Sequence, residues 1–408
     1  MVKKSILPAT LLAVCWLAPS CMPALPNGST VNSQPPATGT TQGTGVCGSG
    51  SWQPGWLEIH HIDAGEGVST LIVSPVGRTM LIDAGEAEWD QSDCAQVIGA
   101  YVRSVLGCAR LDYVVISHFH LDHVGFPGYG GIWHLVHQQG FAIGKLLHRD
   151  LNRYSGASSA TLSQWRAYLQ SDDGRALNPE IATVGESQVQ LGEGVFFAFV
   201  AVDANGSLPA GDFASDPTPP DENDYSIAAV LRMGRLDYFT AGDLSGETMV
   251  SLQGGYSYHD QETRVAPLVK DVDVYRVSHH GSSYASNSTL LAEIDPEVSI
   301  IQVGDDNQDG HPTQSTVDRL LATSALYLTE HGDPNTNLRS GKVVGHVVLR
   351  TATGIDYTVN GDAFLASDPW RTDNDGDGYF SEADPDDNSA TIVPALNGGC
   401  DGVYQTCP

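Results

Sequence analysis

Four side chains that commonly bind metal ions lie within one run of six residues, HFHLDH at 118–123. The run directly follows an apolar, strand-like segment. In extended backbone, residues two apart point the same way, so His118 and His120 can hold one ion together. Asp122 and His123 follow at a turn and can face a second ion. Imidazole and carboxylate ligands in this mixture suit Zn²⁺, Mn²⁺ or Fe better than Mg²⁺ or Ca²⁺.

Strands and helices alternate around this run. Paired strands are predicted at 70–73 and 79–83, and a buried strand at 111–117 delivers the chain to His118. Later strands are predicted at 195–202, 227–233, 236–241, 272–277, 298–303 and 343–350, and helices at 93–107, 161–170, 245–253 and 316–325. This mixture predicts a layered α/β domain in which sheets pack together and helices lie outside.

The charge of the chain narrows the classes of partner. Among 408 residues, 20 Lys and Arg face 49 Asp and Glu, which gives a formal net charge of −29. Such a chain repels nucleic acid and anionic membrane surfaces over long range unless bound cations intervene. Nucleic acid is therefore disfavoured as a partner, whereas the 41% hydrophobic content predicts an ordinary globular core.

Residues 1–24 read as an export signal, because Lys3 and Lys4 precede an apolar stretch too short to span a membrane permanently. Cys21 follows small residues and resembles a bacterial lipoprotein cleavage site, which would attach a lipid anchor; plain secretion is the alternative. Both predict an extracytoplasmic protein, at the outer membrane or cell surface or in the periplasm or medium. Residues 25–54, rich in Pro, Gly, Ser and Thr, predict a flexible linker.

Five further cysteines fit an oxidising compartment. We predict one disulfide between Cys94 and Cys108 and another between Cys400 and Cys407, which leaves Cys47 over. The alternative is that some of these cysteines are buried thiols.

The tail at 366–408 contains nine acidic residues against one arginine. With Asp373 as position 1, Asp375 and Asp377 stand at positions 3 and 5, Gly378 at 6 and Asp384 at 12. This is the spacing of oxygen ligands in a calcium-binding loop, although position 12 is usually Glu. The sequence therefore predicts a small acidic calcium-binding tail.

Several motifs in the chain share one resemblance. The run at 118–123 is preceded by the Asp-Ala-Gly segments at 63–65 and 83–85, and is followed by Ala241-Gly242-Asp243 and His279-His280-Gly281. In this order they resemble the motifs of the metallo-β-lactamase superfamily. The resemblance implies an αββα sandwich of two mixed sheets with outer helices over 55–365, and a site for two Zn (or Mn or Fe) ions. It also implies that Asp243 bridges both ions and that His279 or His280 is the last ligand, with the strand end favouring His279.

A narrower resemblance covers about residues 56–350. The segment 277–282, His311-Pro312-Thr313 and Asn223-Asp224-Tyr225-Ser226 resemble the hydrolase domain of ComEC-type competence proteins. Members are expected to be extracytoplasmic phosphodiesterases or nucleases, and a related choline-phosphate esterase shares the motif order. Two departures stand out: after the signal we find no segment that is apolar and long enough to span a membrane, and His120 is present where many members lack the second His of the run. In addition, there is no clear third ligand for the His118 and His120 ion. His148 is one candidate for that position, and water is another.

These residues predict a metal-dependent hydrolase in which a water between two ions becomes the nucleophile. Asp122 is predicted to orient that water, and His311 to contact a phosphate oxygen or protonate the leaving group. A phosphoester, small or zwitterionic, is the preferred substrate. The same metal pair suits a lactone, thioester or β-lactam, and a non-enzymatic surface binding module is a third reading.

Overall fold

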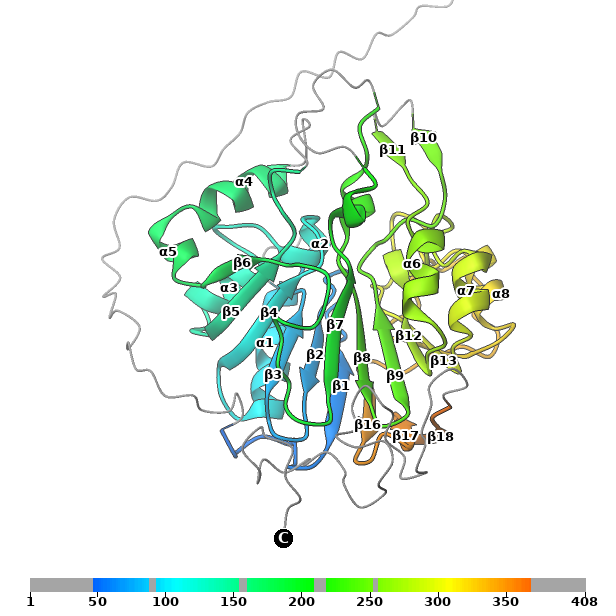
Figure 1. The fold of residues 1–408 in the computed structure, drawn as a ribbon, viewed down its shortest axis with the longest axis horizontal. Coiled ribbons are helices and arrows are strands. Elements are labelled where there is room, and N and C mark those ends of the chain that lie inside the picture. Colours follow the sequence, from blue (N-terminus) through cyan, green and yellow to red (C-terminus); the bar gives the residue numbers. More distant parts are fainter. Residues whose placement is uncertain (1–46, 88–92, 154–159, 209–217, 252–255, 368–408) are drawn as a thin grey trace, which may run out of the picture. The chain divides into compact units, whose positions relative to one another are not determined.

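The structure is a computed structural model that describes residues 47–87, 93–153, 160–208, 218–251 and 256–367. The predicted export signal, the Cys400–Cys407 pair and the calcium loop at 373–384 lie outside the described residues. Figure 1 shows the described elements.

A nine-stranded sheet runs in the order β18-β17-β16-β1-β2-β3-β4-β5-β6. Its strands are parallel from β3 to β6 and antiparallel from β18 to β3, so the sheet is mixed. The bounds are β1 Leu57–His61, β2 Thr70–Val73, β3 Thr79–Ile82, β4 Arg110–Ile116, β5 Ala142–His148, β6 Pro179–Ile181, β16 Val347–Thr351, β17 Asp356–Val359 and β18 Asp362–Leu365.

A second sheet has seven strands in the order β15-β14-β13-β12-β9-β8-β7. It is parallel from β15 to β9 and antiparallel across β9, β8 and β7. The bounds are β7 Phe196–Ala201, β8 Ala228–Met233, β9 Leu236–Thr240, β12 Val274–Arg276, β13 Val298–Ile301, β14 Ala325–Leu328 and β15 Lys342–Val343. A separate hairpin pairs β10 (Met249–Ser251) with β11 (Tyr256–Tyr258).

The two sheets pack face to face, and helices cover their outer faces (Figure 1). Alternate side chains of β1 explain the contact between the sheets. Leu57 and Ile59 are fully buried in one apolar cluster with Leu231 and Ile300 of the second sheet. Burial of each such side chain stabilises the fold by about 1.5–3 kcal/mol. The predicted αββα sandwich is confirmed.

The helices fall into two groups by the sheet they cover. The first group packs on the nine-stranded sheet and the second on the seven-stranded sheet (Figure 1). The bounds are α1 Asp93–Leu106, α2 Leu121–Val124, α3 Gly131–His137, α4 Ala160–Leu169 and α5 Asp172–Arg175, then α6 Glu262–Val269, α7 Ser288–Ile294 and α8 Gln314–Leu320, with 3-10 turns η1 Asp203–Gly206, η2 Glu222–Tyr225 and η3 Ser278–Gly281. Among the described residues, no helix combines the length and the apolar surface needed to cross a membrane.

Two helix predictions need correction. The described part of the segment predicted as a helix at 245–253 is not a helix, because Met249 and Val250 pair with Tyr258 and Ser257 as antiparallel strands. A nine-residue window is too short for its apolar spacing to distinguish the two periods, and cross-strand contacts decide. The helix predicted at 316–325 ends at Leu320, and Ala325 already begins β14.

The predicted Cys94–Cys108 disulfide is also wrong. Cys108 forms its disulfide with Cys47, at a Cα–Cα distance of 5.7 Å, and Cys94 is a free, buried thiol. Cys94 lies in the first turn of α1 and Cys108 lies just beyond its end, so the helix separates them by roughly 20 Å at 1.5 Å per residue. The disulfide and the buried Trp52 also hold residues 47–54 on the domain, where the sequence predicted flexible linker.

Candidate metal centre

The predicted metal-binding residues meet at one edge of the sandwich, where strands of both sheets end. The run at 118–123 follows β4, Asp243 follows β9, and His279 and His280 follow β12. Because β9 and β12 are parallel neighbours, their carboxyl ends lie side by side. The fold thus assembles the site from three segments far apart in sequence.

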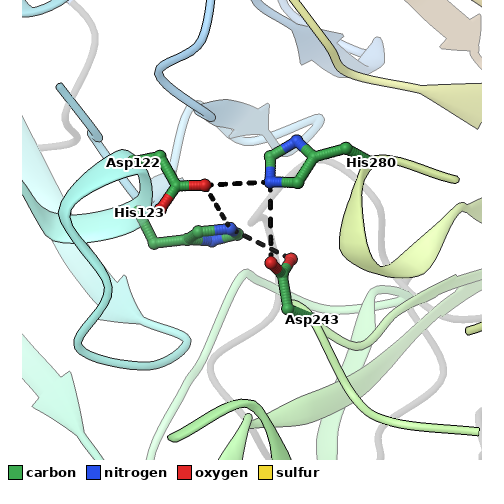
Figure 2. Close-up of side chains that lie close together, drawn as sticks. All are labelled: Asp122, His123, Asp243 and His280. Atoms are coloured by element: carbon green, nitrogen blue, oxygen red, sulfur yellow. Dashed lines mark hydrogen bonds and ion pairs between the residues drawn. The ribbon is translucent and has the colours of Figure 1, made fainter. Parts of the chain in front are cut away.

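Asp122, His123, Asp243 and His280 form a close cluster, with one potential ligand atom of each within 4.8 Å of all the others (Figure 2). His280 Nε2 lies 3.0 Å from Asp122 Oδ2, and His123 Nε2 lies 3.0 Å from Asp243 Oδ1. Of the two histidines that the sequence left open, His280 belongs to this cluster, although the strand end favoured His279.

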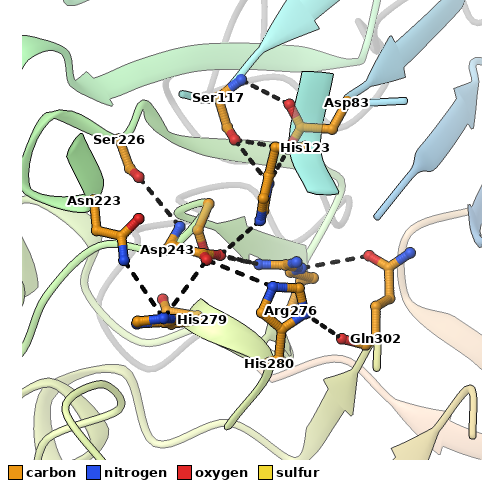
Figure 3. Close-up of polar contacts among 12 residues, drawn as sticks. Asp83, Ser117, His123, Asn223, Ser226, Asp243, Arg276, His279, His280 and Gln302 are labelled. Atoms are coloured by element: carbon orange, nitrogen blue, oxygen red, sulfur yellow. Dashed lines mark hydrogen bonds and ion pairs between the residues drawn. The ribbon is translucent and has the colours of Figure 1, made fainter. Parts of the chain in front are cut away.

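The rings of His280 and His123 are each hydrogen-bonded through Nδ1, which leaves Nε2 suited to bind a cation. His280 Nδ1 donates to the Gln302 carbonyl at 2.9 Å, and His123 Nδ1 donates to Asp83 Oδ2 at 2.8 Å (Figure 3). In a neutral ring the proton on Nδ1 leaves a lone pair on Nε2. His123 Nε2 and Asp243 Oδ1 are buried without a hydrogen-bond partner despite their proximity. Two such atoms facing each other suit a shared metal ion.

Two further potential ligand atoms belong to His118 and His120, near Asp243. His118 Nε2 is 3.1 Å from His120 Nδ1 and 4.0 Å from Asp243 Oδ2. His118 Nδ1 lies 3.1 Å from Ser117 Oγ, which donates to Asp83 at 2.7 Å. His118 is thus oriented in the same manner as His123, with Nε2 toward Asp243.

The electrostatics of the buried cluster suit cation binding. Burial alone would raise the pKa of Asp243, but His123, His280 and His279 hold it well below its usual range. Burial and the neighbouring His123 lower the pKa of His118 well below its usual range, so its ring is neutral. For His280 the effect of burial is outweighed by Asp243 and Asp122, which raise its pKa. A metal ion therefore replaces a proton there when it binds.

Asp83 is a positioning residue that the sequence motifs placed at a turn without a role. Its carboxylate accepts the Ser117 N–H at 2.7 Å and orients His123 directly and His118 through Ser117. The neighbouring Gly85 permits the turn to touch the metal-binding run, because a Cβ there would lie 1.5 Å from the Asp122 carbonyl oxygen.

A buried ion pair between Arg149 and Glu222 holds the backbone of the run at 118–123. Glu222 Oε1 accepts the Phe119 N–H at 3.0 Å and the Arg149 Nε–H at 2.7 Å, and Glu222 Oε2 is held by Arg149 Nη2. Both side chains are almost fully buried. Neither residue was singled out from the sequence, since a lone Glu and a lone Arg more than seventy positions apart have no readable spacing.

His311 lies beside the centre, as expected. Its ring is 5.2 Å from the His279 ring and 6.3 Å from the His280 ring, and its buried Nδ1 has no hydrogen-bond partner. Burial, with His279 and His280 nearby, lowers the pKa of His311 to about 3. By contrast, His148 directs Nδ1 at the Arg149 carbonyl, 2.7 Å away, and lies outside the cluster.

Comparison with known proteins shows similarity to one superfamily and to two competence proteins. Residues 62–129 match the model of the metallo-beta-lactamase superfamily. The chain is 23% identical over 286 residues to ComE operon protein 3 of Bacillus subtilis (strain 168), covering 66% of this chain and 31% of that protein. It is 24% identical over 266 residues to competence protein ComA of Neisseria gonorrhoeae, covering 64% and 29%. The chain thus spans about a third of the length of these relatives.

Solved structures show a distant likeness in fold. CmlA, a diiron β-hydroxylase from Streptomyces venezuelae, aligns with 13% identity and a TM-score of 0.39, covering 72% of this chain and 54% of CmlA. The metallo-beta-lactamase fold protein YhfI from Bacillus subtilis aligns with 14% identity and a TM-score of 0.33, covering 60% and 85%. The matched segment and the αββα sandwich both resemble the metallo-beta-lactamase superfamily of metal-dependent hydrolases.

Proposed function

We propose that the chain is an exported two-metal hydrolase of phosphoesters. One observation supports this above the others: the Asp243 carboxylate belongs to the close cluster with Asp122, His123 and His280, and its Oδ2 also lies 4.0 Å from His118 Nε2, which adjoins His120. A single carboxylate so placed can bridge two ions. Zn, or Mn or Fe, bound there would supply an activated water and polarise the phosphoryl oxygen.

The chain's own residues would position the reactants. The Asp122 side chain is 35% exposed, and its Oδ2 contacts His280. It is placed both to bind metal and to orient the attacking water toward the substrate. His311 has an unpaired buried nitrogen beside the centre. A positive imidazole is disfavoured next to bound cations, so we assign His311 a neutral N–H donor role toward a phosphate oxygen.

A phosphoester is preferred over a carbon ester because the His279-His280-Gly281-Ser282 and His311-Pro312 segments match the competence-type pattern, and the chain is related to two competence proteins. The net charge of −29 opposes the approach of a polyanion. We therefore propose a small or zwitterionic phosphoester, with nucleic acid as the less favoured substrate.

The test is a substrate screen on metal-depleted protein reloaded with Zn²⁺ or Mn²⁺, with Asp243→Ala alongside. A bis-aryl phosphate, single-stranded DNA, a lactone and nitrocefin represent the competing classes. We expect turnover of the phosphodiester, lost in the variant. Turnover of the lactone or nitrocefin alone would overturn the phosphoester assignment, and no turnover by fully loaded protein would overturn the hydrolase proposal.

Export rests on separate support. The Cys47–Cys108 disulfide is typical of an oxidising compartment. We propose that residues 1–24 direct export, with or without lipid on Cys21, that residues 55–365 are the hydrolase domain, and that the tail binds Ca²⁺ through Asp373, Asp375, Asp377 and Asp384. Fractionation of cells with and without Cys21→Ala tests the anchor, and calcium titration of Asp375→Asn tests the tail.

A further inference from the structure

We infer that a cavity beside α4 binds a small uncharged ring compound that carries a hydroxyl group, at a site separate from the metal centre. The cavity has a volume of about 230 Å³ and is lined by residues of β5, α4 and β6 and of the loop after β5. An engineered apolar cavity of about 150 Å³ in another protein binds benzene. The larger space here therefore suits one ring with its substituents.

The cavity lies at a sheet edge where ligands commonly bind. His148 is the last residue of β5 and Ile181 the last residue of β6, and these two strands are parallel neighbours. Sites in such sheets form outside the carboxyl ends of the strands. The metal-binding run follows β4, the other neighbour of β5. The His148 ring meets Phe119 of that run edge to face, with ring centres 6.2 Å apart.

His148 offers the cavity a hydrogen-bond acceptor. The residue is 7% exposed, and its Nδ1 donates to the Arg149 carbonyl at 2.7 Å. Burial lowers the pKa of His148, and the charge of Arg149 lowers it further, so the ring is neutral at neutral pH. With the proton on Nδ1, Nε2 has a lone pair. None of the described residues hydrogen-bonds to this Nε2. A hydroxyl on the ligand would donate to it.

The other walls favour an uncharged ring. Four of the lining side chains are apolar, namely Leu151, Leu169, Pro179 and Ile181. The two charged lining residues, Asp150 and Arg166, have opposite signs, and Arg166 also donates to the Leu151 carbonyl. A charged ligand would therefore lose its hydration without a net opposite charge to receive it. Apolar walls with a few placed polar groups are typical of small-molecule sites.

The loop after β5 is held in its position by the protein itself. Arg149 pairs with the buried Glu222 and also donates to the Asp150 carbonyl at 3.0 Å. The Asp150 N–H donates to Asp203 Oδ2 at 3.0 Å, and Asp150 Oδ1 accepts the Asn152 N–H at 2.9 Å. A wall that is already ordered does not have to be ordered by the ligand, which favours binding of a small molecule.

The test is a titration of the metal-depleted full chain with phenol, followed by ligand-observed NMR. Benzene, benzoate and benzylammonium are the matched probes, because they lack the hydroxyl or add a charge of either sign. We expect one phenol site with a Kd of about 1 mM or lower. Each of the three other probes should bind at least about threefold more weakly.

Three variants locate the site and its acceptor. Ile181→Trp fills the cavity from a position that is 45% exposed, so the chain should fold and phenol binding should weaken by at least about tenfold. Val184→Trp is the matched control, because Val184 is 57% exposed and does not line the cavity. Its affinity for phenol should equal that of wild type. His148→Phe keeps a ring but removes the acceptor, so phenol binding should weaken by about fivefold and benzene binding should not.

Absence of saturable phenol binding by folded wild type would overturn the inference, as would equal affinities in Ile181→Trp and Val184→Trp. Tighter binding of benzoate or benzylammonium than of phenol would overturn the chemical class of the ligand. If His148→Phe does not fold, the comparison of phenol with benzene in wild type tests the same hydrogen bond, and equal affinities would contradict it. These outcomes are independent of the proposed phosphoester hydrolysis, because they report binding to metal-depleted protein.

Discussion

Two clusters in the described part of the chain combine buried histidine with carboxylate, with opposite outcomes. At the metal centre, His123 Nε2 and Asp243 Oδ1 have no hydrogen-bond partner. At the second place, which we call the Glu58 cluster (Glu58, His60, Tyr101 and Arg350), His60 Nε2 contacts Glu58 at 2.9 Å and His60 Nδ1 contacts the Tyr101 hydroxyl at 2.9 Å. Both ring nitrogens of His60 are satisfied by the protein itself.

The two clusters also differ in their numbers of carboxylates and in how closely an arginine approaches them. Arg350 Nε donates to Glu58 at 2.8 Å, so one carboxylate meets one fixed cation. The metal centre contains two carboxylates, Asp122 and Asp243, and the nearest arginine, Arg276, is 3.8 Å from Asp243. The comparison teaches that residue types alone do not distinguish a structural cluster from a metal site. The two clusters differ instead in whether the protein supplies hydrogen-bond partners for their buried ring nitrogens and carboxylate oxygens.

Replacement of Asp243 tests the comparison most severely. Asp243→Ala removes the one carboxylate that faces both sets of ligands, so we expect loss of both ions and a fall in turnover on the order of a thousandfold or more. Metal content after dialysis and initial rates measure this. Retention of both ions in a folded variant would show that Asp243 is not the bridge.

Substitutions in the Arg149–Glu222 ion pair test whether this hydrogen-bonded pair supports the metal-binding run at 118–123. Glu222→Gln removes the closer of two carboxylates that face the buried Arg149, leaving Asp203 at 3.7 Å, and weakens the bond to the Phe119 N–H. We expect a loss of about 3–5 kcal/mol in the free energy of unfolding, measured by urea denaturation of metal-free protein. The double variant Arg149→Met with Glu222→Met is the control, and it should regain part of that loss. A neutral single substitution would contradict the supporting role.

The sequence predicted most of the fold because its strands are apolar runs and its ligands are grouped by motif. It predicted β4, the run at 118–123 and Asp243, all set by local pattern. It did not predict Asp83, Gln302 or Glu222 as partners of the site, because each acts through a contact that the tertiary fold creates. Which of His279 and His280 joins the cluster likewise depends on a left-handed turn, which cannot be predicted from the residue types.

Asp83→Asn tests the orienting hydrogen bonds without touching a ligand. An amide can turn its nitrogen toward His123 Nδ1, which favours the wrong ring tautomer, so we expect metal affinity to fall by about 10–100-fold. Competition with a chromophoric chelator measures the affinity. Asp112→Asn is the matched control, because that buried carboxylate holds Thr79 on a neighbouring strand and should leave metal affinity unchanged. Equal effects in both variants would indicate general loosening.

The Glu58 cluster should show the smallest effect, confined to stability. In Glu58→Gln the amide keeps part of the hydrogen bonding, so we expect a loss of about 1 kcal/mol at neutral pH and unchanged metal affinity. Burial acts to raise the pKa of Glu58, but His60 and Arg350 together lower it below 4.5. A lowered pKa stabilises the fold above the unfolded value and ceases to do so as pH falls through the folded value. The stability difference between wild type and Glu58→Gln should therefore shrink in acid, as urea titrations from pH 7 to pH 3 would reveal. A change in metal affinity instead would break the distinction between the two clusters, because it would mean that the fully hydrogen-bonded cluster also governs the centre.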